Sequence, residues 1–366
     1  MKKKINIFKP YLSVTSTYVG GKSKSEVGAT EKIYKLSSNE NPLGPSPRAI
    51  KAIENQLHTL HEYSDYTGER FRDALEKFYD GELGEDQFVS ANSGVDLLEM
   101  ICRAFLDPGH ESIICSPCFG PYALFTKKCG GTVIDIPLKG SAFNLNVHGI
   151  LDAITDQTRL IFLANPNNPT GTHIGLDAIH QLLEGIPDHV VVVYDEVYQQ
   201  FVQTTDYTTG VSLVQKGYPV IGINSFSKAY GLGGLRVGYA YSTQKLANYL
   251  RQIRRPFMLS SLAQAGGIAA LQDKEHIDKT VKLVNSEKPR LYKAFDKIDL
   301  KYWKSEANFI LIKPELDSRQ FTEQMLEEGI MVRPMEGFGA PGCIRVTIGT
   351  SEANDAFIKA LRKIMA

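Results

Sequence analysis

The sequence predicts an α/β protein with a large unit, built on a mostly parallel β-sheet flanked by helices, and a smaller α+β unit. Two observations support this prediction. Between residues 47 and 225, short apolar segments alternate with segments whose apolar residues have helical spacing, a pattern typical of a sheet covered on both faces. The segment 190–194 is Val-Val-Val-Val-Tyr, without polar alternation, as expected for a strand buried on both sides.

The large unit is expected to contain the following elements. Helices are predicted at 48–60, 69–79, 95–106, 121–128 and 176–184, and strands at 88–90, 112–115, 133–136, 160–164, 190–194 and 220–224.

The pattern changes after about residue 245. We therefore expect a large domain over 45–265, and an N-terminal arm and small domain from 1–44 and 266–366. Predicted here are mostly helical segments at 245–254 and 261–295, strands at 308–312, 330–333 and 343–348, and a last helix with Ser351 as N-cap and Glu352 in its first turn.

Composition excludes several classes of protein. The 366 residues carry 41 basic and 41 acidic side chains, and a net charge of zero argues against a nucleic-acid partner held by a basic surface. No run approaches the roughly 18 apolar residues of a membrane helix. The chain starts Met-Lys-Lys-Lys, but the apolar segment 5–8 is too short for a signal peptide. With five cysteines, an odd number, we expect a cytoplasmic protein.

Polar side chains follow the ends of four predicted strands. In an open parallel sheet, ligands bind beyond the carboxyl ends of the strands, so these side chains are expected to meet at one site. Each alone has an ordinary explanation, such as a turn, a solvated lysine or a helix-capping arginine. The candidates are Phe119, the loop 165–171, Asp195, Tyr198, Ser225, Ser227, Lys228 and Arg236.

Three strings among these residues resemble a known family. They are Asn-Asn-Pro-Thr-Gly at 167–171, Asp-Glu-Val-Tyr at 195–198 and Ser-Phe-Ser-Lys-Ala-Tyr-Gly-Leu-Gly-Gly-Leu-Arg-Val-Gly-Tyr at 225–239. The chain resembles the pyridoxal-phosphate (PLP) aminotransferases of fold type I, and among them most the histidinol-phosphate aminotransferases. The resemblance extends from Asn-Glu-Asn-Pro at 39–42 to the segment 343–350.

The resemblance implies roles for the residues that hold the cofactor ring. Lys228 would form the Schiff base with PLP and then move the proton, a role that suits a lysine whose pKa is lowered by burial. Asp195 would keep the pyridine nitrogen protonated. Asn168 and Tyr198 would hydrogen-bond the ring oxygen, and Phe119 would stack on the ring.

The resemblance also implies a phosphate cradle. The helix that begins near Gly94 and Val95 would offer backbone N–H groups to the phosphate. The side chains of Ser225, Ser227 and Arg236 would add two hydroxyl groups and a guanidinium. Val95 stands where the family usually has a polar residue, so only its backbone can contribute. A tyrosine of the neighbouring subunit would complete the cradle in a homodimer. Tyr63 matches it best and Tyr66 second, although both could simply pack at a surface turn.

For the substrate, the resemblance implies Arg345 as the partner of an α-carboxylate and Arg333 as the partner of a substrate phosphate. Tyr11 could assist Arg333. The implied reaction is a ping-pong transfer of an amino group, from L-histidinol phosphate to 2-oxoglutarate. An aromatic amino-acid aminotransferase, a lyase similar to threonine-phosphate decarboxylase, and a non-catalytic PLP-binding regulator stay open as alternatives.

Two other motifs are expected to carry no chemistry. Cys115 and Cys118 have C-x-x-C spacing, but the other three cysteines are scattered, so no zinc site is expected. His58 and His61 are three residues apart without further candidate ligands, and we expect no metal.

Overall fold

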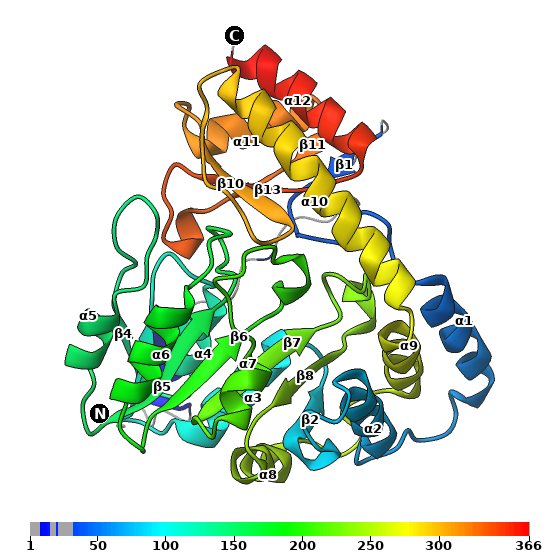
Figure 1. Ribbon diagram of the computed structural model, residues 1–366, viewed down its shortest axis with the longest axis vertical. Helices are drawn as coiled ribbons and strands as arrows, with labels where there is room; N and C mark the ends of the chain where they lie inside the picture. The colour runs from blue at the N-terminus through cyan, green and yellow to red at the C-terminus, as the bar shows by residue number, and fades with distance from the viewer. Residues whose placement is uncertain (1–7, 15–19, 21–31, 366) are drawn as a thin grey trace, which may run out of the picture.

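A computed structural model describes residues 8–14, 20 and 32–365 of the chain. Its largest sheet has seven strands in the order β2-β8-β7-β6-β5-β3-β4 (Figure 1). Only β8 runs antiparallel to its neighbours, so the predicted, mostly parallel sheet is confirmed. The strands are β2 (Phe88–Ala91), β3 (Glu111–Ile114), β4 (Thr132–Asp135), β5 (Thr158–Ala164), β6 (Val191–Asp195), β7 (Val220–Ser225) and β8 (Gly238–Tyr241).

Helices cover both faces of this sheet. Along β6, Val191 and Val193 belong to one buried cluster, with residues of α3, α4 and α8, whereas Val192 and Tyr194 belong to another, with residues of α2, α6 and α7. A strand buried on both faces needs apolar residues at every position. These helices are α2 (Glu69–Phe78), α3 (Gly94–Phe105), α4 (Pro121–Lys128), α6 (Leu176–Gly185), α7 (Gly210–Gln215) and α8 (Gln244–Ile253).

The second unit is an antiparallel sheet of four strands in the order β12-β13-β10-β9, seen above the large sheet in Figure 1. Its strands are β9 (Lys301–Tyr302), β10 (Phe309–Lys313), β12 (Arg333–Pro334) and β13 (Ile344–Thr347). Helices α10 (Lys274–Asp296), α11 (Ser318–Glu327) and α12 (Ser351–Met365) accompany it, and β1 (Tyr34–Lys35) pairs with β11 (Ile330–Met331).

Several predicted elements need correction. The segment 261–295, predicted to be mostly helical, is confirmed as such and contains two helices, α9 (Ser261–Leu271) and α10, because Asp273 caps the second by accepting from His276 N. The strand predicted at 330–333 is divided between β11 and β12, which pair with different partners. Ser351 is the first helical residue of α12, and the hydroxyl of Thr350 accepts from Ala353 N. The shorter elements β8, β9, α5 (Val147–Asp152), α7 and α11 were not predicted.

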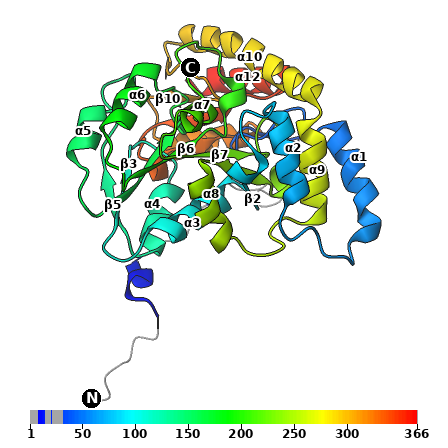
Figure 2. The ribbon, with the colours of Figure 1, turned by 60° about the horizontal axis from the view of Figure 1, so that its bottom comes forward.

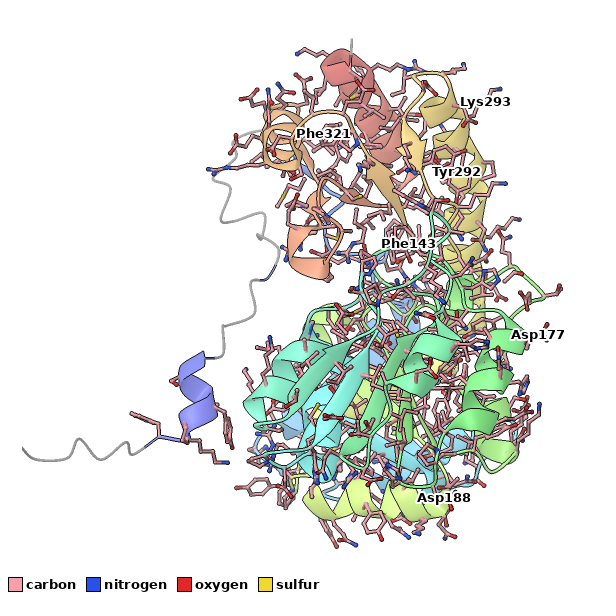
Figure 3. All side chains as sticks on the ribbon, turned by 90° about the vertical axis from the view of Figure 1, so that its left-hand side faces the viewer. Phe143, Asp177, Asp188, Tyr292, Lys293 and Phe321 are labelled. Atoms are coloured by element: carbon pink, nitrogen blue, oxygen red, sulfur yellow. The ribbon has the colours of Figure 1, made fainter. Side chains whose placement is uncertain are left out.

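The predicted domain boundary at 265 falls inside α9, which packs against α1 (Pro47–Gln56) and α2. The division into 45–265 and the remainder stays a prediction. A second contact joins the loop between β4 and α5 (Val147–Asp152) to the residue that follows β9: Trp303 Nε1 donates to the Ser141 carbonyl at 2.7 Å, and the ring centroids of Trp303 and Phe143 are 5.2 Å apart. Figure 3 shows Phe143 at the level where the two units meet.

The lysine-rich start of the chain lies outside the described residues. Within the described part, the short 3₁₀ helix η1 (Pro10–Val14) lies near the lower end of the large unit (Figure 2). No helix in the described residues is long and apolar enough to cross a membrane, and those residues include no cluster of candidate metal ligands. All five cysteines are free thiols, and burial raises the pKa of Cys118 to about 12, so this buried thiol is a poor nucleophile at neutral pH.

Candidate active site

A cavity of about 330 Å³ lies at the carboxyl ends of the parallel strands, between the large sheet and the small one. Twelve of the fourteen residues predicted from the sequence line it, and Tyr63 and Tyr11 do not. The twelve are Gly94, Val95, Phe119, Asn168, Asp195, Tyr198, Ser225, Ser227, Lys228, Arg236, Arg333 and Arg345.

Lys228 is the amine of this cavity. It follows β7, and its Nζ donates to the Ser38 carbonyl at 2.8 Å. Burial, with the nearby guanidinium of Arg345 as second cause, lowers the pKa of Lys228 to about 7. An amine with this pKa exists partly as the free base at neutral pH, which a nucleophile and proton carrier requires.

Asp195 is a buried carboxylate at the end of β6. Its Oδ2 accepts from the Tyr122 hydroxyl at 2.8 Å, and its Oδ1 accepts from Val197 N at 3.2 Å. Burial raises the pKa of Asp195, whereas these two donors and the charge of Lys228 act in the opposite direction. A positively charged group placed against this carboxylate would favour its ionised form.

One end of the cavity has the properties of an anion site. Gly94 and Val95 are the first residues of α3, and N–H groups in a first helical turn have no acceptor within the helix. The hydroxyl of Ser225 donates to that of Ser227 at 3.0 Å, and Arg236 Nη1 donates to the Gly233 carbonyl at 2.7 Å.

Gly238 explains how β8 approaches this helix start. A Cβ added at Gly238 would lie 2.6 Å from the carbonyl carbon of Ser93, so a larger residue could not occupy this position without moving the start of α3. The close approach brings Arg236 and Gly94 to one cavity.

Two arginines enter the cavity from the small sheet. Arg333 on β12 and Arg345 on β13 are cross-strand partners in register, so their side chains lie on the same face. Arg345 Nη1 donates to Asn168 Oδ1 at 2.6 Å and its Nη2 donates to the Ser37 carbonyl at 3.0 Å. Its guanidinium also lies 5.3 Å from the ring centroid of Phe309. Two like charges side by side favour an anion between them.

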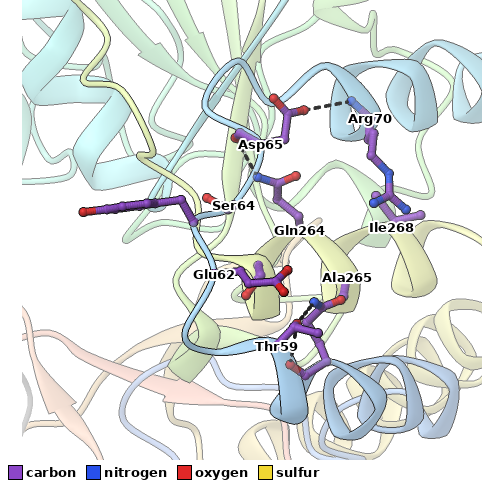
Figure 4. A pocket seen from close by; sticks show the side chains of 11 residues that line it. Thr59, Glu62, Ser64, Asp65, Arg70, Gln264, Ala265 and Ile268 are labelled. Carbon is purple, nitrogen blue, oxygen red and sulfur yellow. Dashed lines mark hydrogen bonds between the residues drawn. The ribbon is translucent and has the colours of Figure 1, made fainter.

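A second, smaller hollow contains Tyr63, with Glu62, Ser64, Asp65 and Gln264 (Figure 4). Gln264 Nε2 donates to the Asp65 carbonyl at 3.1 Å. Tyr63 is 87% exposed, and its ring centroid lies 4.7 Å from that of Phe257. The ring centroid of Tyr66 lies 6.0 Å from that of Phe257. Tyr63 is thus on the surface of its own chain, and its predicted role stays a prediction.

Tyr11 lies in η1, at a distance from the arginines. A Cβ added at Gly130, in the turn between α4 and β4, would be 2.9 Å from Cδ1 of Tyr11. The described contacts therefore place Tyr11 at the end of α4 that is opposite to Phe119, and its part in substrate binding stays a prediction.

Sequence reasoning missed three kinds of cavity residue. Tyr122, the second residue of α4, lies three positions after Phe119 and its hydroxyl donates to Asp195; a tyrosine in the helix that follows β3 was a usable signal. Phe338, from the 3₁₀ turn η7 (Glu336–Phe338), lies 5.8 Å from the Arg345 guanidinium. The segment containing Ser37, Ser38 and Asn39 also lines the cavity, although no strand precedes it in the large sheet.

The chemistry of these side chains fits PLP. The cofactor needs an amine for its aldehyde, a carboxylate for its ring nitrogen and donors for its phosphate. The cavity has one lysine, Lys228, one buried aspartate, Asp195, and an anion site at the start of α3. Phe119 is half-buried at the cavity wall, where an aromatic ring could stack against the cofactor.

Comparisons with known proteins define the family. Residues 31–361 match the profile of the family described as aminotransferase class I and II. A histidinol-phosphate aminotransferase of Moorella thermoacetica is 37% identical over 355 residues, which cover 95% of this chain and 90% of the relative. A histidinol-phosphate aminotransferase of Akkermansia muciniphila is 38% identical over 334 residues, which cover 91% and 90%.

Solved structures share the fold. The crystal structure of a histidinol-phosphate aminotransferase from Sinorhizobium meliloti, in complex with pyridoxal-5'-phosphate, has a TM-score of 0.88 at 23% identity and covers 98% of this chain and 97% of its own. An aspartate aminotransferase from Thermus thermophilus with maleate has a TM-score of 0.84 at 20% identity and covers 99% of both chains. The architecture is that of the fold type I transferases. The chain belongs to the class I and II aminotransferases, and it is an aminotransferase.

Proposed function

We propose that this aminotransferase binds PLP and transfers the amino group of L-histidinol phosphate to 2-oxoglutarate, in histidine biosynthesis. The observation that carries the substrate is the pair Arg333 and Arg345, cross-strand partners in the cavity that also contains Lys228. A phosphate monoester offers the charge that two adjacent guanidinium groups favour. The names of the relatives from Moorella thermoacetica and Akkermansia muciniphila support the same substrate.

The residues of the chain have separable tasks in this reaction. PLP, when bound, supplies a ring that accepts electrons from the bond broken at the substrate carbon. Lys228 takes and returns a proton at Nζ, which its pKa of about 7 permits near neutral pH. Asp195 holds a proton on the ring nitrogen, while Tyr122 and the Val197 N–H keep the carboxylate in place. Asn168 orients Arg345.

A half-reaction tests the substrate. The PLP form is mixed separately with histidinol phosphate, phenylalanine or O-phosphothreonine, and absorbance is recorded from roughly 300 to 500 nm. Fastest loss of the visible band with histidinol phosphate, together with gain of the band of the aminated cofactor, is the expected result. Conversion by phenylalanine alone would indicate an aromatic aminotransferase. Release of CO₂ from O-phosphothreonine would indicate a decarboxylase.

The alternative of a non-catalytic PLP-binding regulator, which the sequence left open, disagrees with the family, because the chain is an aminotransferase. It predicts no change of absorbance with any amine, and binding to DNA in a gel shift at low salt. The zero net charge of the chain argues against such binding.

The proposal includes a homodimer, with Tyr63 of one subunit reaching the cofactor phosphate of the other. The exposed rings of Tyr63, Tyr66 and Phe257 form a contiguous surface, and exposed aromatic side chains are typical of interfaces. Sedimentation of the purified protein tests the dimer. We also propose a cytoplasmic location, which the five free cysteines support.

A further inference from the structure

The side chain of Asn39 contacts the hydroxyl group expected to bind the cofactor ring. Asn39 Nδ2 donates to the Tyr198 hydroxyl at 3.0 Å. Asn39 is fully buried, Tyr198 is 6% exposed, and both residues line the cavity. A phenol oxygen that accepts this N–H keeps its own hydrogen for another acceptor. The contact therefore restricts the directions in which the Tyr198 hydroxyl can donate.

The hydrogen bonds around Asn39 distinguish the two ends of its amide. Thr347 Oγ1 accepts from Asn39 N at 2.9 Å and donates to Asn39 Oδ1 at 3.2 Å. With the amide oxygen paired to a donor, the amide nitrogen is the group that faces Tyr198, and the network assigns it as a donor. The ring of Tyr198 is held from another side by Phe309, at a centroid distance of 5.1 Å in an edge-to-face arrangement.

The backbone of Asn39 is adapted to this position. Its φ is +55°, in the left-handed region that asparagine tolerates better than most residues other than glycine. Its carbonyl accepts from Asn308 Nδ2 at 3.0 Å. The two preceding carbonyls, of Ser37 and Ser38, accept from Arg345 and Lys228. Three consecutive residues thus contact three different side chains of the site.

We propose that Asn39 is a positioning residue: its amide donates to Tyr198 and directs the Tyr198 hydroxyl toward the oxygen on the ring of the bound cofactor. This inference rests on PLP being the cofactor. A donor to that ring oxygen stabilises the form in which the oxygen carries more negative charge. Asn39 would then influence, through Tyr198, the pH at which the bound cofactor changes its absorbance.

Substitutions that respect the backbone test this role. Asn39→Gly removes the amide and tolerates the positive φ, whereas Asn39→Asp keeps the shape but replaces the donor with an acceptor, which takes the hydrogen of Tyr198 for itself. Asn41→Gly is the matched control, because Asn41 lies in the same segment as Asn39 but its amide nitrogen donates to the Ala229 carbonyl and to Thr280 Oγ1.

The readout is the pH midpoint of the visible absorption band of the PLP-loaded protein. We expect Asn39→Gly to raise the midpoint by about 0.5 units, and Tyr198→Phe and Asn39→Asp by about 1 unit each. In the Tyr198→Phe background, Asn39→Gly should cause no further shift, because the two residues act as one unit. Asn41→Gly should leave the midpoint unchanged.

Three results would overturn the inference. If Asn39→Gly shifts the pH midpoint by the same amount in the wild-type and Tyr198→Phe backgrounds, Asn39 does not act through the Tyr198 hydroxyl. No shift by Asn39→Asp, in a variant whose melting temperature matches the wild type, would exclude a role for the donor. A wild-type protein that forms no visible band with PLP would refute the proposed function as well, and only this last result affects both proposals.

Discussion

The two hollows that contain predicted site residues differ in how they are built. In the cavity at the strand ends, Lys228, Asp195 and Arg345 each form a hydrogen bond with a residue distant in sequence. Tyr63 lines the smaller hollow, is 87% exposed, and has its ring centroid 4.7 Å from that of Phe257. The twelve predicted residues that line the first site all come from one chain. In the homodimer that we propose, the tyrosine of the second hollow would contribute to the site of the partner subunit, and the following experiments test this difference.

The largest effect is expected at Lys228, because the proposed function assigns the covalent and proton-transfer chemistry to it. Lys228→Ala should lower the rate of amino transfer by about 10³-fold or more and abolish the visible band with PLP. Single-turnover absorbance measurements check both. Lys245→Ala, at an exposed lysine of α8, should leave them unchanged. Normal turnover by Lys228→Ala would refute the assignment of the cavity as the active site.

The next largest effect is expected at Arg333, which lines the same cavity from strand β12 of the small sheet. Arg333→Gln should reduce kcat/KM for histidinol phosphate about 100-fold, since a charged hydrogen-bonding pair is lost, and should affect phenylalanine far less. Arg319→Gln is the control, because the Arg319 side chain is 87% exposed on α11. Equal losses with both amines would mean that Arg333 does not recognise phosphate.

A pH profile tests how the cavity sets the reactivity of Lys228. The pKa of Lys228 is lowered to about 7, so the amine is protonated and unreactive below that pH and free above it. The rate at which the apoprotein captures PLP should therefore rise with pH around 7 instead of above 10. Arg345→Gln removes a positive charge that lowers this pKa, so the midpoint of the profile should move to higher pH by about 1 unit. Arg345→Lys keeps the charge and should leave it in place.

The smallest effect is expected at the exposed tyrosine. Tyr63→Phe should weaken PLP binding about fivefold, the loss of one hydrogen bond to phosphate, and leave the dimer intact in sedimentation. Tyr66→Phe should not change the affinity. If Tyr66→Phe weakens PLP binding and Tyr63→Phe does not, Tyr66 is the tyrosine that contacts the phosphate. Wild-type affinity in both variants would favour the simpler explanation, in which the two rings only pack at a surface turn.

Much of the fold was predictable, because apolar periodicity reports burial directly. The unbroken Val run of β6 and the helical spacing of α3 both correspond to the elements observed. The strand β8 (Gly238–Tyr241) was missed because its residues were interpreted only as part of a motif. Helix α11 had a usable signal in its N-cap, Asp317, which accepts from Arg319 N and Gln320 N.

The pairing of the segment 330–333 was not predictable in the same way. Its first half pairs with β1 and its second half with β13. The partners of a strand depend on chain segments remote in sequence, and one continuous β pattern is compatible with either. The register of Arg333 against Arg345, on which the substrate proposal depends, emerges only from that pairing.

The sequence alone determined the type of sheet, the strand ends and the polar residues that follow them, because hydrophobic periodicity and the topology of parallel strands leave few alternatives. The tertiary structure decided which residues from outside those strands complete the cavity. Asn39 reaches Tyr198 across 159 positions of the chain, and Tyr122 reaches Asp195 across 73. Such contacts depend on how remote segments pack, and no local pattern encodes them.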